Sequence, residues 1–356
     1  MTAQETARDR AQTPLQRAVR AVLTQRTVLL IVLIIVVVVW MSLLSAGGYL
    51  SADYNPDYMS AALVDAVPLA MLALAELIVI LSGRGGIDLS VGAIVSLTGM
   101  VFGFAYGQWG WPLWLAVPLA LVVGAALGGI NGLLVARLRF PALIATLATY
   151  YAYKSIAIVI NQQQPISTEP VQQLYAVTSS VELPLIGRNI PDVPLGVITF
   201  LLPAVVVVWL LLTRTTYGRR LFGIGTNDVA AQWSGIDVAA TRMRAYVLAG
   251  MIAGLVAVYV TAQFASARPD AGTSGNGLAL PAITIAVLGG VAITGGIGKV
   301  SGVVLAAVLI TWLNAGILLY VPGNAGTQFQ LFALGIILVF AALLNAITTR
   351  RYGGTR

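Results

Sequence analysis

Four charged side chains lie in or beside long apolar stretches of this sequence, and they are the residues best placed to do chemistry: Asp65, Glu76, Asp88 and Lys154. A charge is costly in hydrocarbon, so a charge in such a stretch usually serves a function or pairs with another charge. For Asp88, capping of a helix end is the preferred interpretation over contact with a bound small molecule. For Glu76 and Lys154, a structural ion pair and a place along a polar path are equally good interpretations.

Uncharged polar and aromatic side chains in the apolar stretches are the next candidates. A neutral polyol is bound mostly by amides, hydroxyls and aromatic rings. Together with Asp88 and Lys154, the candidates for lining a path through the protein are Asn131, Tyr150, Tyr151, Gln263 and Asn314.

The chain lacks the residues from which most enzyme sites are built. It contains no Cys and no His, which removes thiol nucleophiles, the commonest metal ligand and the usual acid–base group near neutral pH. The stretch GGIGKVS resembles a phosphate-binding loop, but that motif needs Gly and then Ser or Thr where this chain has Ile293 and Val300. We therefore expect no catalytic residue, no metal, no cofactor and no nucleotide site in this chain.

The composition indicates a protein that lies in lipid. Hydrophobic residues make up 58% of the sequence and charged residues 9%, whereas about 25% of a soluble domain is charged. About 20 apolar residues cross the hydrocarbon layer as a helix. The expected spans are about 28–46, 61–82, 87–107, 112–136, 141–161, 196–213, 243–263, 279–296, 301–320 and 328–347. The expected fold is an all-α, polytopic membrane bundle of about ten helices.

Lys and Arg residues gather in alternate gaps between these spans, where 17 of the 20 fall if the N-terminus is cytosolic. Because positive charge favours the cytosolic side, both termini are expected there. The chain then divides into a cytosolic tail (1–27), a membrane domain (28–347) and a second cytosolic tail (348–356). The longest cytosolic loop is 213–244, and the largest outside loop is 162–195. This orientation explains the net charge of +7, and no nucleic-acid partner is expected.

Glycine is dense in the spans and predicts close helix packing and interrupted helices. Glycines recur every four residues in two runs, Gly99, Gly103, Gly107 and Gly124, Gly128, Gly132. This spacing gives one helix face without side chains, against which a neighbouring helix can pack closely. The glycine-rich stretches 82–92 and 288–302 are the expected interruptions or re-entrant segments, which transporters use where backbone lines a cavity.

The loop 213–244 contains a short helix signal. Asn227 can cap a helix whose first residue, Asp228, suits the positive end of the helix dipole. Val229, Ala230 and Trp233 would share one face of that helix, and a glycine at 235 suits its end. Two interpretations fit: an ordinary amphipathic loop helix, or a helix that docks in a groove of a cytosolic partner.

Four blocks of the sequence together resemble one family. They are GGIDLSVGAIVSLTG (85–99), NGLLVARLRFPALIATLAT (131–149), TTYGRRLFGIGTNDVAAQWSGI (215–236) and LALPAITIAVLGGVAITGGIGKVSG (278–302). The chain resembles the permease subunits of bacterial ABC importers of the ribose, xylose, rhamnose and autoinducer-2 class. The resemblance runs over most of residues 60–347, in the order of that family.

The resemblance implies a transport subunit of the bacterial inner membrane that is not itself an enzyme. Its implied partners are a second permease subunit (identical or a sister chain), a cytosolic ABC ATPase, a periplasmic solute-binding protein and membrane lipid. In that family the 215–236 region contacts the ATPase. The implied coupling residues are Gly218, Arg219, Gly225, Asn227, Asp228, Ala230, Ala231, Trp233 and Gly235.

The resemblance also limits the transported solute to a sugar or sugar-like molecule: a pentose, a rhamnose-type deoxyhexose or an autoinducer-2-like compound. Ribose-type members usually carry an acidic pair where this chain has Ala279 and Pro281. That departure favours the autoinducer-2 and rhamnose branches. The alternative function is a secondary transporter that works alone and couples transport to an ion.

Overall fold

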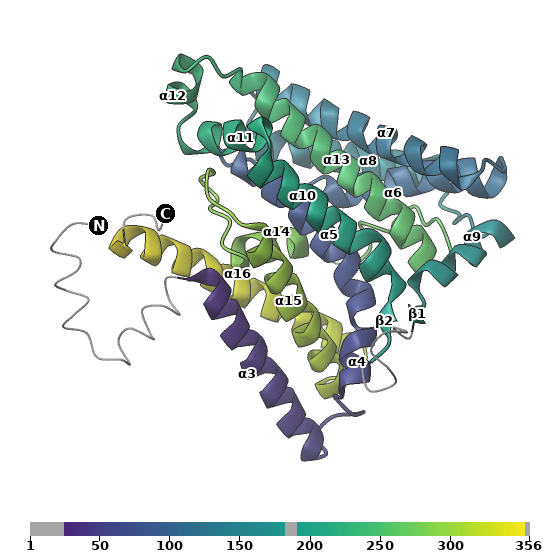
Figure 1. The fold of residues 1–356 in the computed structure, drawn as a ribbon. Helices are drawn as coiled ribbons and strands as arrows, with labels where there is room; N and C mark the ends of the chain where they lie inside the picture. The colour runs from purple at the N-terminus through teal and green to yellow at the C-terminus, as the bar shows by residue number, and fades with distance from the viewer. Residues whose placement is uncertain (1–24, 182–190, 276, 353–356) are drawn as a thin grey trace, which may run out of the picture.

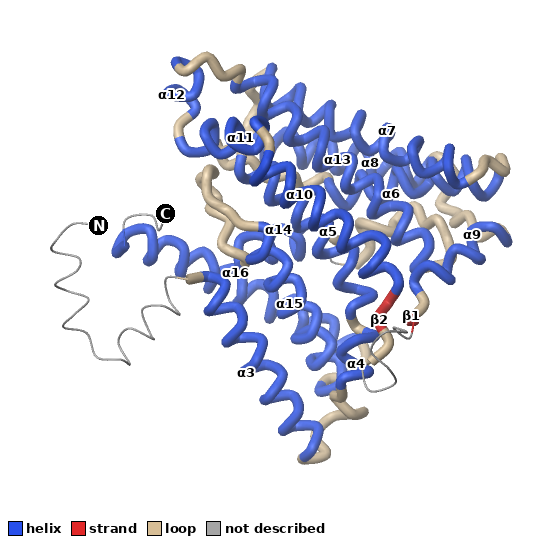
Figure 2. Tube along the Cα trace, viewed as in Figure 1, coloured by secondary structure: helices blue, strands red, loops and turns tan. Residues whose placement is uncertain are grey.

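The computed structural model describes residues 25–181, 191–275 and 277–352 (Figure 1). The leader before residue 25, which carries most of the expected N-terminal tail, and residues 353–356 of the expected C-terminal tail lie outside the described residues. The described part is almost wholly helical (Figure 2). Its one small sheet pairs β1 (Ser180–Val181) with β2 (Val193–Pro194) in antiparallel fashion, within the predicted outside loop.

The helices follow one another with short connections. Their bounds are α3 Arg26–Ala46, α4 Pro56–Ala61, α5 Leu63–Leu81, α6 Val91–Phe102, η1 Gly103–Gln108, α7 Leu113–Gly132, η2 Leu133–Arg137, α8 Ala142–Val159, α9 Glu169–Gln173, η3 Leu174–Thr178, η4 Val197–Leu201, α10 Leu202–Arg214, α11 Thr216–Thr226, α12 Asp228–Trp233, α13 Val238–Gln263, α14 Ala279–Leu288, α15 Val300–Tyr320 and α16 Asn324–Tyr352. The elements η1, η2 and η4 are π-helical turns that continue or precede an α-helix.

The centre of the bundle is formed by α5 and α13, and the apolar outer faces suit lipid. Nearly every side chain of α5 from Ala66 onward is buried, and so is most of α13. By contrast α3, α7, α10 and α16 expose large apolar side chains along much of their length. The expected polytopic helical bundle is therefore confirmed.

Nine helical segments of the described chain are long and apolar enough to cross a membrane. The expected span over 279–296 is different, because α14 covers only Ala279–Leu288 and is about 15 Å long. Gly290 has a φ of +91°, which glycine adopts readily, and the chain then runs as a loop to Val300.

Loops complete the crossing that α14 makes only in part. Gln263, at the end of α13, bonds Asp65 near the start of α5, and the Gly296 N–H donates to the carbonyl of Leu81 at the end of α5. The segment between Gln263 and Gly296 therefore runs the length of α5. The first residues of α3 lie at the same end of the bundle as α11 and α12 (Figure 1).

The end of the interrupted segment 82–92 meets the loop before α14 inside the bundle. The Gly272 N–H donates to the hydroxyl of Ser96 on α6 at 2.9 Å, and a Cβ on Gly92 would overlap the Gly272 carbonyl. Backbone that reaches this depth without being helical must be enclosed by protein or line a cavity. The predicted interruptions at 82–92 and 288–302 are both present, as non-helical backbone over 82–90 and 289–299, and a further break before α14 covers the described residues 264–275 and 277–278.

The glycine stripe on α7 packs directly against α13. A Cβ on Gly124 or Gly128 would overlap the backbone carbonyl of Gly250 or Tyr246, so only glycine allows the two helices to lie this close. The predicted close packing is thus present.

We expect Gly128→Ala to lower the stability of the protein by about 1–3 kcal/mol, because the added methyl must push α7 away from α13. The matched control is Gly129→Ala, whose Cβ would meet only the Val247 side chain at 3.6 Å. Thermal unfolding in detergent compares the two. Equal midpoints for both variants would contradict the packing argument.

Candidate functional site

The segment that connects α10 to α13 forms two short helices at one end of the bundle. Thr215 caps α11 by accepting from the Gly218 N–H at 3.1 Å, and Asn227 caps α12 by accepting from the Ala230 N–H at 2.9 Å. α12 ends at Trp233, and Gly235 follows with a φ of +80°. The two-turn helix and its start and stop are where the sequence predicts them.

One face of α12 is apolar and exposed. Trp233 is 88% exposed and Val229 57%, and Ala230 beside them is exposed as well. Ala231 alone in this helix is buried and holds α12 against the bundle. A large exposed tryptophan beside apolar neighbours is typical of a protein–protein contact surface. We name the side chains of Val229, Ala230 and Trp233 the α12 face.

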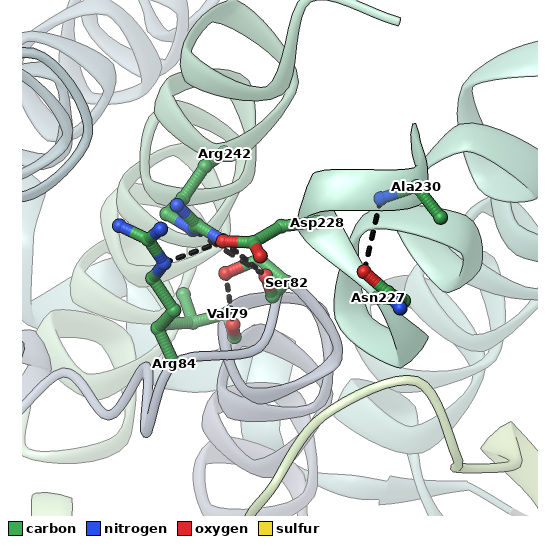
Figure 3. Close-up of polar contacts among 7 residues, drawn as sticks. All are labelled: Val79, Ser82, Arg84, Asn227, Asp228, Ala230 and Arg242. Atoms are coloured by element: carbon green, nitrogen blue, oxygen red, sulfur yellow. Dashed lines mark hydrogen bonds and ion pairs between the residues drawn. The ribbon is translucent and has the colours of Figure 1, made fainter. Parts of the chain in front are cut away.

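Ion pairs tie α12 to the bundle beneath it (Figure 3). Asp228 pairs with Arg84, from the loop after α5, and lies 3.8 Å from the guanidinium of Arg242 on α13. The buried Arg242 also donates to the carbonyl of Ser82 at 3.0 Å. A displacement of α12 would therefore also displace the loop after α5 and the start of α13, through these ion pairs.

Gly225 of α11 packs directly against the backbone of Leu81 and Gly296, and we name this contact the glycine junction. A Cβ on Gly225 would overlap the carbonyl of Leu81 and the N–H of Gly296, so three backbones meet there. They belong to α11, the end of α5 and the loop after α14. Gly218 is buried against the backbone of α10, whereas Arg219 is exposed. Burial raises the pKa of Tyr217, despite the nearby Arg244, so its hydroxyl stays a neutral donor toward Thr241.

Asp88 and Asn131, two of the predicted path residues, lie in one buried cluster. The Asp88 carboxylate accepts from the N–H and hydroxyl of Ser90 and from the Asn131 amide at 3.2 Å. Asn131 in turn accepts from the Thr149 hydroxyl at 2.7 Å. Asp88 thus stabilises the turn before α6, and the cluster links α6, α7 and α8.

We expect Asn131→Leu to lower stability by about 1–3 kcal/mol, because Asp88 then loses a buried donor. The exposed Gln164→Ala serves as the control. Thermal unfolding in detergent measures both. A midpoint unchanged by Asn131→Leu would contradict a structural role and favour the path interpretation.

The other candidates on α8 differ in exposure: Tyr150 and Lys154 are half-buried, and Tyr150 packs against the core. Tyr151 is exposed, and Lys154 lies 5.7 Å from the centroid of the Tyr150 ring. Glu76 is fully buried and accepts from the Asp88 N–H. Among the described residues no ion pair joins Glu76 to Lys154, so the ion-pair interpretation is wrong. Their opposite charges are the only basis for that interpretation, whereas Glu76 lies beside Asp88 and Lys154 lies beside Tyr150.

Gln263 and Asn314 line one cavity of about 520 Å³ between α4, α5, α13, α15 and α16. Both are among the path residues predicted from the sequence, whereas Thr311, which also lines the cavity, is not. The sequence marks Asp65 only as a costly charge, and it gives no sign that Arg84 and Arg242 are partners of Asp228. The usable signal was the position of Asp65 within an apolar stretch.

A polytopic helical bundle with interrupted crossings and a two-helix connection at one end has the architecture of a membrane permease. Residues 58–342 match the family model described as branched-chain amino acid transport system / permease component. The chain belongs to this family.

Individual relatives cover most of the chain. It is 33% identical over 282 residues to the ribose import permease protein RbsC of Escherichia coli strain K12, which covers 78% of this chain and 81% of that protein. It is 32% identical over 294 residues to the autoinducer 2 import system permease protein LsrD of Klebsiella pneumoniae, covering 81% and 82%. The RbsC protein of Bacillus subtilis is 35% identical over 262 residues, covering 73% and 76%. No solved structure gives a significant match.

Proposed function

We propose that this chain is the permease subunit of an ABC importer that carries a sugar or sugar-like solute across the bacterial inner membrane. Family membership and the two groups of relatives, whose names state ribose and autoinducer 2, support the solute class. Their identities to this chain are nearly equal, so the proposed class includes both.

The observation that carries the proposal is the exposed α12 face together with its ties to the core. A partner that buries Trp233 and Val229 would pull on Asp228, and through it on Arg84 and Arg242. The proposed partner is a cytosolic ATPase, which would dock there and drive the bundle between two packings. This places the end that carries α11 and α12 in the cytosol, as the positive charges predict.

The remaining partners follow from the same proposal. A second permease subunit, identical or a sister chain, would complete the pathway. A periplasmic binding protein would deliver the solute at the opposite end, where the loop 162–195 lies. This chain contributes no ATP hydrolysis; the partner ATPase supplies it.

Uptake into proteoliposomes tests the proposal. The permease is reconstituted with its ATPase and binding protein and offered D-ribose, D-xylose, L-rhamnose and autoinducer 2. ATP-dependent uptake of one of these compounds is expected. Uptake that an ion gradient drives without ATP or partners would instead establish the secondary transporter.

A further inference from the structure

The 520 Å³ cavity lies toward the end of the bundle opposite α12, and its size is in the range of small-molecule sites. It is formed by the five helices α4, α5, α13, α15 and α16 and by the loop before α14. Its polar side chains are Tyr58, Asp65, Gln263, Thr311, Asn314 and Gln330. No Lys or Arg is among its described lining residues, so it offers no partner for a phosphate or carboxylate.

Thr311 presents a hydroxyl at the wall of this cavity. The residue is only 4% exposed, and its hydroxyl has no hydrogen-bond partner among the described residues. A buried helical threonine normally bonds a carbonyl of its own helix, as Thr261 does with Ala257 at 2.8 Å. A buried hydroxyl left unpaired costs free energy. A polar group in the cavity would satisfy it.

Asp65 and Gln263 also line the cavity, and both can form hydrogen bonds with hydroxyl groups. The Gln263 amide donates to the Asp65 carboxylate at 2.7 Å, which joins α13 to α5 and fixes both side chains. The carboxylate has further lone pairs, and the amide oxygen of Gln263 can accept as well. Nearby, the Gln330 amide donates to the backbone carbonyl of Asn314 at 2.9 Å and holds α16 against α15.

The interrupted crossing brings backbone to the same cavity. Ala271 and Leu278, on either side of the break, both line it. Leu278, the residue before α14, lines the cavity, so the uncapped N-terminal end of α14 and the positive end of its dipole lie near the cavity wall. Non-helical backbone at membrane depth is typical of transporter binding sites.

We propose that this cavity is a binding site for a neutral polyhydroxylated solute. The Asp65 carboxylate accepts hydrogen bonds from hydroxyl groups of the solute, and Thr311 and the amides of Gln263 and Asn314 form its remaining hydrogen bonds. The rings of Tyr58 and Phe264 pack against its apolar face. The proposal rests on the function proposed above and names where the permease itself contacts the solute.

The natural absence of cysteine allows a direct test of access. In the reconstituted complex, we expect Thr311→Cys to react with a small, charged, membrane-impermeant thiol reagent. The panel sugar that the wild-type complex imports should slow this reaction at least threefold. Thr261→Cys, equally buried but outside the cavity, should not react. An unreactive Thr311→Cys, or a reaction that the imported sugar does not slow, would overturn the site.

Uptake provides the second measurement. Asp65→Asn and Thr311→Val should raise the sugar concentration for half-maximal uptake about tenfold, since each removes a hydrogen bond to the solute. ATP hydrolysis without sugar should be unchanged, and Thr261→Val should behave as wild type. Unchanged uptake by both cavity variants would refute the site and leave the importer intact. A wild-type complex that imports no panel sugar with ATP would refute the proposed function, and labelling of Thr311→Cys would still decide whether the cavity is open to water.

Discussion

Replacing Val229 and Trp233 together by Asp is expected to abolish ATP-driven uptake, a loss of at least about a hundredfold. Both side chains are exposed in the free permease, so the change costs little there. In the complex with the ATPase, however, two carboxylates would be buried without partners at an apolar contact, which costs several kcal/mol. Uptake and co-purification of the ATPase should both be lost, while the amount of permease in the membrane is unchanged.

The controls for this prediction lie at the end of α12 and directly after it. Trp233→Phe keeps an apolar ring and should retain most uptake. Ser234→Ala removes only an exposed hydroxyl that bonds the carbonyl of Ala230 and should have no effect. If the double Asp variant imports normally, the α12 face does not dock the ATPase, and α12 is an ordinary amphipathic loop helix.

Gly225→Ala is expected to have the second largest effect. The added methyl would overlap the carbonyl of Leu81 and the N–H of Gly296, neither of which can move without shifting α5 or the loop after α14. We expect a loss of about 1–3 kcal/mol in stability. Uptake should fall by more than this loss of stability explains, because the junction transmits the movement of α11 to the core. Thermal unfolding and uptake should be measured on the same preparation.

Gly223→Ala is the matched control for the junction. Gly223 lies in α11 only two residues away, and its Cβ would meet nothing closer than the Ile236 side chain at 4.0 Å. It should leave stability and uptake unchanged, or raise stability slightly through helix propensity. If Gly223→Ala and Gly225→Ala behave alike, the effect comes from the flexibility of α11 and not from the junction.

Local features of this molecule were readable from its sequence. The cap at Asn227, the exposed pair Val229 and Trp233, and the glycine stripe on α7 each depend on spacing within one helix or turn. Helix periodicity and capping chemistry fix such features without knowledge of the fold.

Features that join distant segments were not readable in this way. Asp65 and Gln263 are 198 positions apart, and Arg242 reaches Ser82 over 160. Hydropathy says which segments enter the membrane but not which of them pack together. For the same reason the sequence suggests an ion pair between Glu76 and Lys154, although in the structure the neighbour of Glu76 is Asp88. The helix expected over 279–296 is shorter in the structure, because Gly289 and Gly290 end α14 at the start of the interruption expected at 288–302.

The central claim is that this permease moves its solute only when an ATPase acts on the α12 face. The most direct measurement is uptake of the panel sugars into proteoliposomes that contain the wild-type permease or the Val229→Asp, Trp233→Asp variant, each with the ATPase and binding protein. We predict uptake by the wild type only when ATP is supplied on the side of the membrane where the ATPase is bound. We predict no uptake by the variant. Equal uptake by both proteins, or uptake without ATP under an ion gradient, would contradict the claim.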